Sequence, residues 1–124
     1  MNNGLAERII DAAHEVHRHL GGPGLLENIY ETALCHELSL RGLFNQRQLP
    51  IPVLYKNIAV RDPLFLDILV ENEVIVEIKA TEKDFPYYRM QLSTHLRLSG
   101  KKLGVLINFG KEILKDGICQ VINV

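Results

Sequence analysis

The segment from Leu64 to Ala80 constrains the fold of this chain most strongly, because its local pattern allows few arrangements. Two runs of branched apolar residues, 68–70 and 74–76, lie on either side of the polar residues 71–73. Short apolar runs that are separated by a polar turn are typical of a β-hairpin. We therefore expect two strands that lie in the interior of a sheet.

Three charged residues interrupt this apolar hairpin: Asp67, Glu77 and Lys79. Side chains alternate along a strand with period two, so the length of the turn decides which of them share a face. A three-residue turn at 71–73 places Asp67 opposite Glu77 on one face. A two-residue turn would place the two carboxylates on opposite faces, and no shared site could form.

Two carboxylates that face each other across a hairpin repel. Opposed Cβ atoms lie about 5 Å apart, and two charges at that distance repel by about 3 kcal/mol at an effective dielectric constant of 20. A divalent cation between Asp67 and Glu77 would reverse this term. Lys79 follows Glu77 by two positions, so it adds an ammonium group on the same face. The alternative is an exposed ladder of alternating charges, and the residues alone leave both interpretations open.

The overall composition limits the classes of function. The 124 residues suffice for one domain, and a net charge of −1 gives no general attraction to nucleic acid or to an anionic membrane. Any contact with nucleic acid must therefore be local. Cys35 and Cys119 lie far apart in apolar surroundings, which indicates reduced thiols, with a disulfide as the alternative. Without a secretory signal or a membrane-spanning apolar run, we expect a cytoplasmic protein.

Helical periodicity dominates the N-terminal part of the chain. Apolar residues recur at helical spacing over 5–20 and 26–41, which predicts two helices. His14, His17 and His19 lie in the first helix. His14 and His17 are one turn apart, but no third ligand is spaced to join these two in a metal site. We expect these histidines at the surface.

Extended segments follow the two helices. Residues 44–55 contain Pro50 and Pro52, so they cannot form a fully paired central strand. Pro86 suits the first turn of a third helix, with Asp84 as its expected cap. The further strands are predicted at 58–60, 103–109 and 118–124.

Two residues near the start of the second helix have ordinary interpretations. Glu27 is an anion at a helix N-terminus, where the helix dipole favours negative charge. Tyr30, three positions later, shares its face and is expected in the core with its hydroxyl at the boundary. Taken alone, neither residue predicts a function.

The order of these features resembles a known group of proteins. Asp67 followed by Glu77-Ile78-Lys79 is similar to the motif of the PD-(D/E)XK nuclease superfamily, and residues 24–30 fit the GxxExxY signature of a small bacterial family assigned to it. Further segments look like that family in order: 15–18, 91–92, 106–109 and 115–117.

The resemblance implies an α/β fold with a restriction-endonuclease-like core over residues 1–124. A mixed β-sheet would be flanked by helices, in the order helix, helix, three strands, helix, two strands. It implies a metal-dependent nuclease that hydrolyses phosphodiester bonds, with DNA as the expected substrate and Mg²⁺, or Mn²⁺ as a substitute, as the cofactor. The alternative is a catalytically silent module for nucleic-acid or protein interaction.

The resemblance also assigns roles to individual residues. Asp67, Glu77 and Glu27 would bind the metal. Lys79 would be the catalytic lysine, and Gln91 matches the glutamine of a QxxxY pattern found in related nucleases. Here the chain departs from the pattern, because His95 stands where the tyrosine would be.

The small size of the chain bears on its partners. One domain offers little groove for nucleic acid, so we expect a homodimer or a partner protein to complete substrate binding, and no membrane partner. The acidic pI, the histidine at position 95 and the lack of an expected recognition domain favour the silent alternative, whereas intact Asp67, Glu77 and Lys79 favour the nuclease.

Overall fold

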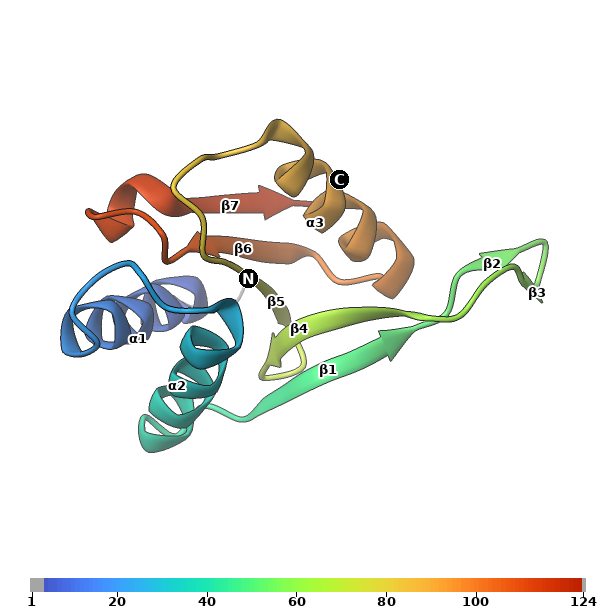
Figure 1. Ribbon diagram of the computed structural model, residues 1–124. Helices are drawn as coiled ribbons and strands as arrows, with labels where there is room; N and C mark the ends of the chain where they lie inside the picture. Colours follow the sequence, from blue (N-terminus) through green and yellow to red (C-terminus); the bar gives the residue numbers. More distant parts are fainter. Residues whose placement is uncertain (1–3, 124) are drawn as a thin grey trace.

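A computed structural model describes residues 4–123 (Figure 1). The chain forms helices and strands in the order α1 (Leu5–His19), α2 (Glu27–Leu40), β1 (Asn45–Ile51), β2 (Leu54–Tyr55), β3 (Ile58–Ala59), β4 (Leu64–Val70), β5 (Val74–Lys79), α3 (Pro86–Ser99), β6 (Leu103–Asn108), the 3-10 turn η1 (Leu114–Gly117) and β7 (Ile118–Ile122). No helix within the described residues is long and apolar enough to cross a membrane.

The main sheet has five strands in the order β1-β4-β5-β6-β7. β5 and β6 run parallel and are connected through α3, whereas the other neighbouring strands are antiparallel. The sheet is therefore mixed, as expected for a restriction-endonuclease-like fold. β4 and β5 are interior strands, which confirms the prediction from their apolar runs.

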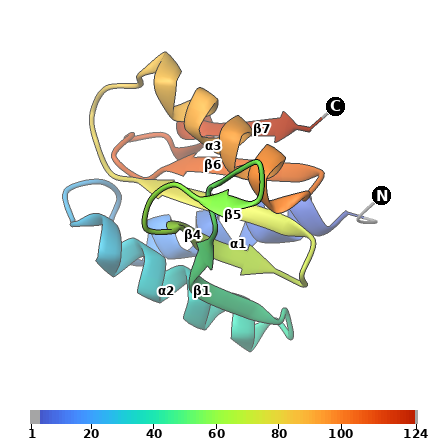
Figure 2. The same cartoon turned by 90° about the vertical axis from the view of Figure 1, so that its right-hand side faces the viewer.

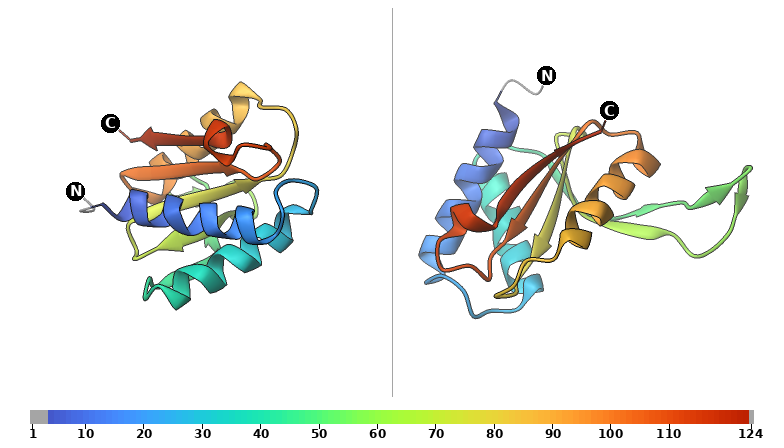
Figure 3. Two further views of the ribbon diagram at one scale, coloured as in Figure 1. Left: turned by 90° about the vertical axis from the view of Figure 1, so that its left-hand side faces the viewer. Right: turned by 90° about the horizontal axis from the view of Figure 1, so that it is seen from above.

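The elements form three layers (Figures 2 and 3). α1 and α2 cover one face of the sheet, and α3 covers the other. β5 faces both layers, because Val74, Val76 and Ile78 pack under α1 and α2 while Ile75 packs under α3. This burial on both faces explains why β5 is apolar along nearly its whole length.

The hairpin between β4 and β5 has the predicted three-residue turn. Val70 pairs with Val74, and the antiparallel register ends at the pair formed by Ile68 and Val76. Glu71 and Asn72 reverse the chain with positive φ angles of 52° and 56°. The predicted register is confirmed as far as Ile68 and Val76, the chain neighbours of Asp67 and Glu77, but the ladder stops there, so Asp67 and Glu77 do not form a strand pair.

β1 and β4 form a ribbon that changes face halfway along its length. Ile68, the partner of Arg47, packs under α2, whereas Leu66 and its partner Leu49 pack toward α3. Gln48, at the crossover, has a φ angle of 49° and no register partner. A residue in the left-handed region interrupts the alternation of period two. The outer half of the ribbon extends away from the body and carries β2 and β3 at its tip (Figure 1).

The number of strands between the second and third helices differs from the expectation of three. Residues 44–55 divide at Pro52 into β1 and β2, because proline cannot donate the hydrogen bond that would continue the ladder. β2 then pairs with β3 in a separate two-stranded sheet. β1 is an edge strand, as its prolines predict. The predicted last strand ends at Ile122, and Val124 lies outside the described residues.

Two local predictions were wrong. Asp84 does not cap α3, which begins after Phe85 without a side-chain cap. Instead, Asp84 accepts a hydrogen bond from Asn108 Nδ2 at 3.1 Å and pairs with Lys111 Nζ at 3.1 Å. His17 is buried, and its Nε2 lies 2.8 Å from the Lys111 carbonyl oxygen. These contacts tie the loops that follow β5 and β6 to the rest of the fold.

The remaining side chains with specific predictions lie mostly where expected. His14 and His19 are exposed. Cys35 is buried, Cys119 is half-buried, and both are free thiols. Glu27 is exposed while Tyr30 is fully buried, so the two do not share an environment.

Tyr30 anchors the loop that carries the GxxExxY signature. Its ring stacks on Phe109 with centroids 4.7 Å apart. The hydroxyl donates a hydrogen bond to the Gly22 carbonyl oxygen at 2.7 Å and accepts one from the Leu25 backbone N–H at 3.2 Å. The signature tyrosine thus connects the α1–α2 loop to the core.

Tyr30→Phe tests this anchoring role. The substitution keeps the stacked ring but removes both hydrogen bonds, so we expect the free energy of unfolding to fall by about 1 kcal/mol. Urea denaturation measures the change. Tyr55→Phe is the matched control, because Tyr55 is 63% exposed on β2, and its effect should stay within about 0.5 kcal/mol. Equal losses in the two variants would contradict the anchoring role.

Candidate active site

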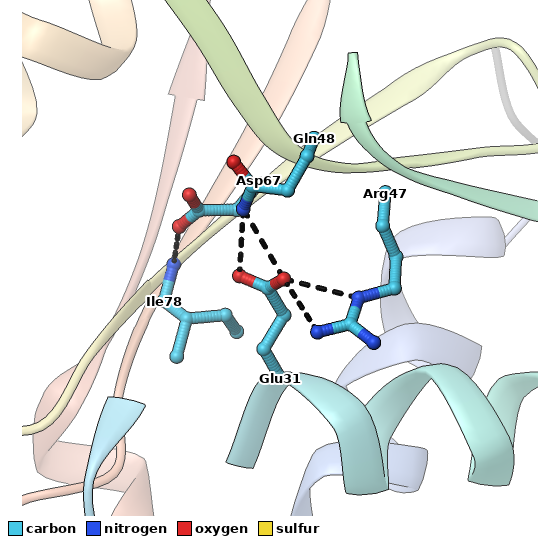
Figure 4. Close-up of polar contacts among 5 residues, drawn as sticks. All are labelled: Glu31, Arg47, Gln48, Asp67 and Ile78. Carbon is cyan, nitrogen blue, oxygen red and sulfur yellow. Dashed lines mark hydrogen bonds and ion pairs between the residues drawn. The ribbon is translucent and has the colours of Figure 1, made fainter. Parts of the chain in front are cut away.

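The candidate site lies at a fork where β4 and β5 separate. Their ladder ends at the pair of Ile68 and Val76, whereas β5 stays paired with β6 as far as Lys79 and Asn108. Asp67 fills the opening, because its Oδ2 accepts a hydrogen bond from the Ile78 backbone N–H at 2.8 Å (Figure 4). The carboxylate thus takes the place of a strand partner.

Glu77 extends from β5 toward α3. Its side chain is buried although it is charged, and the residue is only 6% exposed. Glu77 Oε2 lies 3.4 Å from the Asp67 backbone N and 3.5 Å from His95 Nδ1. The latter separation is too long for a strong hydrogen bond. His95 Nδ1 is buried without a hydrogen-bond partner among residues 4–123.

The surroundings of Asp67 favour its protonated form. Burial, followed by the negative charge of Glu77, raises the pKa of Asp67 to about 7. The charge of Glu31 acts in the same direction, while the Ile78 N–H and Lys79 oppose it. The carboxylate of Glu77 raises the pKa of His95. The fork thus concentrates negative charge that a cation would relieve.

Lys79 is half-buried at the end of β5, two residues after Glu77, and its charge counteracts the rise in the pKa of Asp67. Its Nζ lies 4.7 Å from the centre of the Tyr88 ring on α3, a cation–π contact. It makes no ion pair among residues 4–123. The structure therefore brings Asp67, Glu77 and Lys79 together at one place, with the ammonium group held by an aromatic face.

Glu27 and Gln91 make no hydrogen bond or ion pair with the carboxylates of the fork within residues 4–123. Glu27 is exposed at the first position of α2, and its charge helps to raise the pKa of Tyr88, after burial and the neighbouring Tyr87. Gln91 is exposed on α3, one turn before His95. Neither Glu27 nor Gln91 makes a side-chain hydrogen bond within the described part of the chain. Their roles stay predictions.

Glu31 is the acidic residue of α2 whose charge reaches Asp67, and the sequence reasoning missed it. It is 7% exposed and accepts hydrogen bonds from Arg47 Nε at 3.1 Å and Nη2 at 2.9 Å, and from Gln48 Nε2 at 3.2 Å (Figure 4). A signal was present, because Glu31 shares helical spacing with the apolar residues Leu34 and Leu38. A carboxylate on the inward face of a helix indicates a buried polar contact.

The contacts of Glu31 explain how the fork is held open. They attach α2 to β1 at Gln48, the residue where the ribbon changes face. Arg47 balances the buried charge of Glu31 through an ion pair at 2.9 Å. The side chain of Glu31 is 9% exposed, whereas that of Arg47 is 40% exposed. Glu31 therefore acts as a positioning residue for the crossover opposite Asp67.

Asn108 fixes the position of the chain on the other side of β5, as Glu31 does at β1. Its Oδ1 accepts hydrogen bonds from the Thr81 N–H at 3.1 Å and the Gly110 N–H at 2.9 Å. The Phe109 N–H donates to the Lys79 carbonyl oxygen at 2.8 Å. These bonds fix the chain on both sides of Lys79. The contact between residues 81 and 108 depends on the sheet, so the local sequence could not reveal it.

A pocket of about 610 Å³ lies next to the loop that follows Lys79. It is lined by segments from three loops: 23–25 of the signature, 80–82 after β5, and 110–112 after β6. The signature loop is thus placed at the end of β5 that carries Lys79. This placement explains how residues so far apart in sequence border one region.

The chemistry of the fork fits a hard divalent cation. Mg²⁺ prefers oxygen ligands and often uses only one or two carboxylates, with waters and substrate phosphates completing its shell. Asp67 Oδ1 and Glu77 Oε1 have no hydrogen-bond partner among residues 4–123. No cluster of three or more His, Cys, Asp or Glu suited to a metal occurs among the residues that the structure describes. The fork therefore fits an open two-carboxylate site rather than a closed cage.

Asp67→Asn tests the electrostatics of the fork in EDTA. In the folded protein the pKa of Asp67 is raised from 3.8 to about 7, so the folded state holds this proton more tightly and its stability falls as the pH rises through that window. At pH 8 the substitution should stabilise the protein by up to about 4 kcal/mol, since each pKa unit corresponds to about 1.4 kcal/mol, and at pH 5 by less than half of that. Melting temperatures at the two pH values measure this.

Asp116→Asn is the control for this experiment, because Asp116 is exposed in η1. It should change the melting temperature equally little at both pH values. An effect of Asp67→Asn that is the same at pH 5 and pH 8 would contradict a raised pKa for Asp67.

Comparison with known proteins places this geometry in a family. A search of curated proteins and a search of solved structures gave no match. The family model described as PD-(D/E)XK nuclease superfamily matches residues 3–121. Nucleases of this superfamily generally depend on a divalent metal and act on nucleic acid. With a match over nearly its whole length and a mixed sheet flanked by helices, the chain belongs to the PD-(D/E)XK nuclease superfamily.

Proposed function

We propose that this protein is a metal-dependent nuclease that hydrolyses phosphodiester bonds in DNA, with Mg²⁺ as its cofactor and Mn²⁺ as a substitute. The observation that carries the proposal is the fork, where the buried carboxylate of Glu77, the half-buried carboxylate of Asp67 and an ammonium group converge. Membership of the nuclease superfamily supports the same reaction class.

Asp67 and Glu77 are the proposed metal-binding residues. The carboxylate oxygens that make no hydrogen bond within residues 4–123 are free to bind. A bound Mg²⁺ lowers the pKa of water and offsets charge on the scissile phosphate. The raised pKa of Asp67 means that this carboxyl must release its proton to bind a cation near neutral pH.

Lys79 is the proposed catalytic residue. Its ammonium group would orient the attacking water or stabilise charge that develops on the phosphate. The ring of Tyr88 holds this group near the carboxylates without an ion pair in the described part of the chain that would have to be broken. Gln91 would contact the substrate from the exposed face of α3.

The finer assignment within the superfamily is also a proposal. The GxxExxY signature at 24–30 supports a place in the bacterial family of that name, as a single domain over residues 1–124 that acts in the cytoplasm. Glu27, the acidic residue of the signature, is proposed as an additional metal ligand. The charge of Glu31 helps to raise the pKa of Asp67, whereas the charge of Glu27 helps to raise the pKa of Tyr88. A second copy or a partner protein would complete the substrate groove.

The alternative is a catalytically silent module for nucleic-acid or protein interaction. One observation favours it: His95 replaces the tyrosine of the QxxxY pattern, and its Nδ1 faces Glu77 rather than the surface. An imidazolium at this position would compete with a cation for the carboxylate. Activity with added metal separates the two functions.

Lys79→Ala provides the decisive variant. With Mg²⁺ or Mn²⁺, the wild-type protein should cleave DNA, and the substitution should lower the rate by at least about a hundredfold because a stabilising charge is lost from the transition state. Gel assays on single-stranded, duplex and branched DNA measure the rate. The melting curve and Mn²⁺ binding should show an intact fold and site.

Lys115→Ala is the control, because Lys115 is an exposed lysine in η1 outside the fork. It should keep the wild-type rate. If the wild-type protein binds Mn²⁺ yet leaves all three substrates intact, the proposed nuclease activity is wrong and the silent module is supported. Full activity in Lys79→Ala would exclude the proposed role of this lysine.

A further inference from the structure

Three aromatic side chains gather where α3 begins. Phe85, Tyr87 and Tyr88 contact one another, with ring centroids 5.7 Å apart for the first pair, 5.4 Å for Phe85 and Tyr88, and 4.8 Å for the two tyrosines. Tyr88 is half-buried and packs against the core under α3, whereas Phe85 is 39% and Tyr87 51% exposed. We refer to these three residues as the aromatic cluster.

The aromatic cluster adjoins the fork. Tyr88 carries Lys79 Nζ over its ring, and Tyr87 lies against the same tyrosine. The exposed rings are therefore separated from the proposed catalytic ammonium group by a single aromatic side chain. A strand whose phosphate reached Lys79 would pass directly over or beside these rings.

Packing does not account for the exposed part of the cluster. The core under α3 is already filled by fully buried Leu92 and Leu96 and by Tyr88 at its edge. Phe85 and Tyr87 add apolar surface in contact with water next to Tyr88 and Lys79. Exposed apolar side chains that gather in one patch are typical of an interaction site.

The charge of the chain favours stacking over phosphate contacts. A duplex is held mainly through its phosphates, which requires many lysine or arginine contacts. The net charge here is −1, and the exposed cations nearest in sequence to the aromatic cluster are Lys83 and Arg89. Stacking of bases on aromatic rings needs no positive charge, but it requires bases that are not already stacked in a duplex.

We propose that Phe85 and Tyr87 form a stacking platform for an unpaired base, so that the preferred ligand of this site is a single-stranded segment of nucleic acid. This inference rests on the proposed function, because the strand is taken to cross the fork. Tyr88 forms the base of the platform and holds Lys79 beside the phosphate that follows the stacked base.

The chain contains a closely matched control for this platform. Tyr55 is an exposed tyrosine like Tyr87, with 63% of its surface exposed against 51%. It lies on β2 at the tip of the ribbon, away from the body of the protein (Figure 1). Tyr55 has Lys56 Nζ over its ring at 5.4 Å, whereas the cation beside the platform lies over Tyr88.

Binding in EDTA tests the platform without cleavage. Fluorescence anisotropy would give the affinity of the full chain for a labelled oligothymidylate and for a labelled blunt duplex. The wild type should bind the oligothymidylate more tightly. Tyr87→Leu should lower the ratio of the two affinities by about 5- to 100-fold, since one stacked base contributes roughly 1–3 kcal/mol. Tyr55→Leu should leave the ratio within about twofold of wild type.

A spectroscopic signal separates stacking from a structural effect. A strand that contains 2-aminopurine loses fluorescence when this base stacks on a ring, so quenching by the wild type should persist in Tyr87→Phe and disappear in Tyr87→Leu. If Tyr87→Leu does not fold, Phe85→Leu replaces it. An unchanged ratio, an equal loss in Tyr55→Leu, or tighter binding of the duplex by the wild type would overturn the platform.

The outcomes for the platform and for the nuclease are independent. If single-strand binding depends on Tyr87 but the protein cleaves nothing with Mg²⁺ or Mn²⁺, the platform is supported and the nuclease proposal is wrong. If cleavage depends on Lys79 but wild type and Tyr87→Leu have the same single-strand preference, the nuclease is supported and the platform is wrong.

Discussion

One hydrogen bond organises the functional end of this fold: the Asp67 carboxylate accepts the Ile78 N–H that a continuing ladder would have bound. Without it, the separation of β4 from β5 would leave a buried donor unsatisfied, at a cost of about 1–3 kcal/mol. With it, the strands separate while β5 stays attached to β6. The same carboxylate that closes the ladder is brought against Glu77, so the structural and the chemical roles of Asp67 are inseparable.

Hydrogen bonds from neighbouring elements hold the chain in place on both sides of the fork. Glu31 holds β1 at Gln48, and the change of face there turns β4 away from β5. On the opposite side, Asn108 fixes the loop that follows Lys79. Ordinary apolar packing on both faces of the sheet stabilises the rest. Hydrogen bonds of this kind on neighbouring elements position the side chains of a site before a ligand binds.

Much of the fold was predictable because it follows local rules. The turn of three residues fixed the register of β4 and β5, and the prolines in 44–55 placed β1 at an edge. Glu31 and Asn108 escaped prediction because their partners are brought near by the crossover at Gln48 and by the parallel pairing of β6. Glu27 attracted attention as part of a motif, yet motif membership does not determine which helix position faces a neighbouring strand.

The central claim is that Asp67 and Glu77 together hold a divalent cation at the fork. A Mn²⁺ titration followed by melting temperature at pH 8 tests it most directly. The wild type should gain stability as Mn²⁺ rises, by mass action on the folded state, and Glu77→Gln should lose this gain while Glu37→Gln, which removes a carboxylate paired with Arg41 on α2, keeps it. A wild type without any shift, or an equal shift in Glu77→Gln, would contradict the claim.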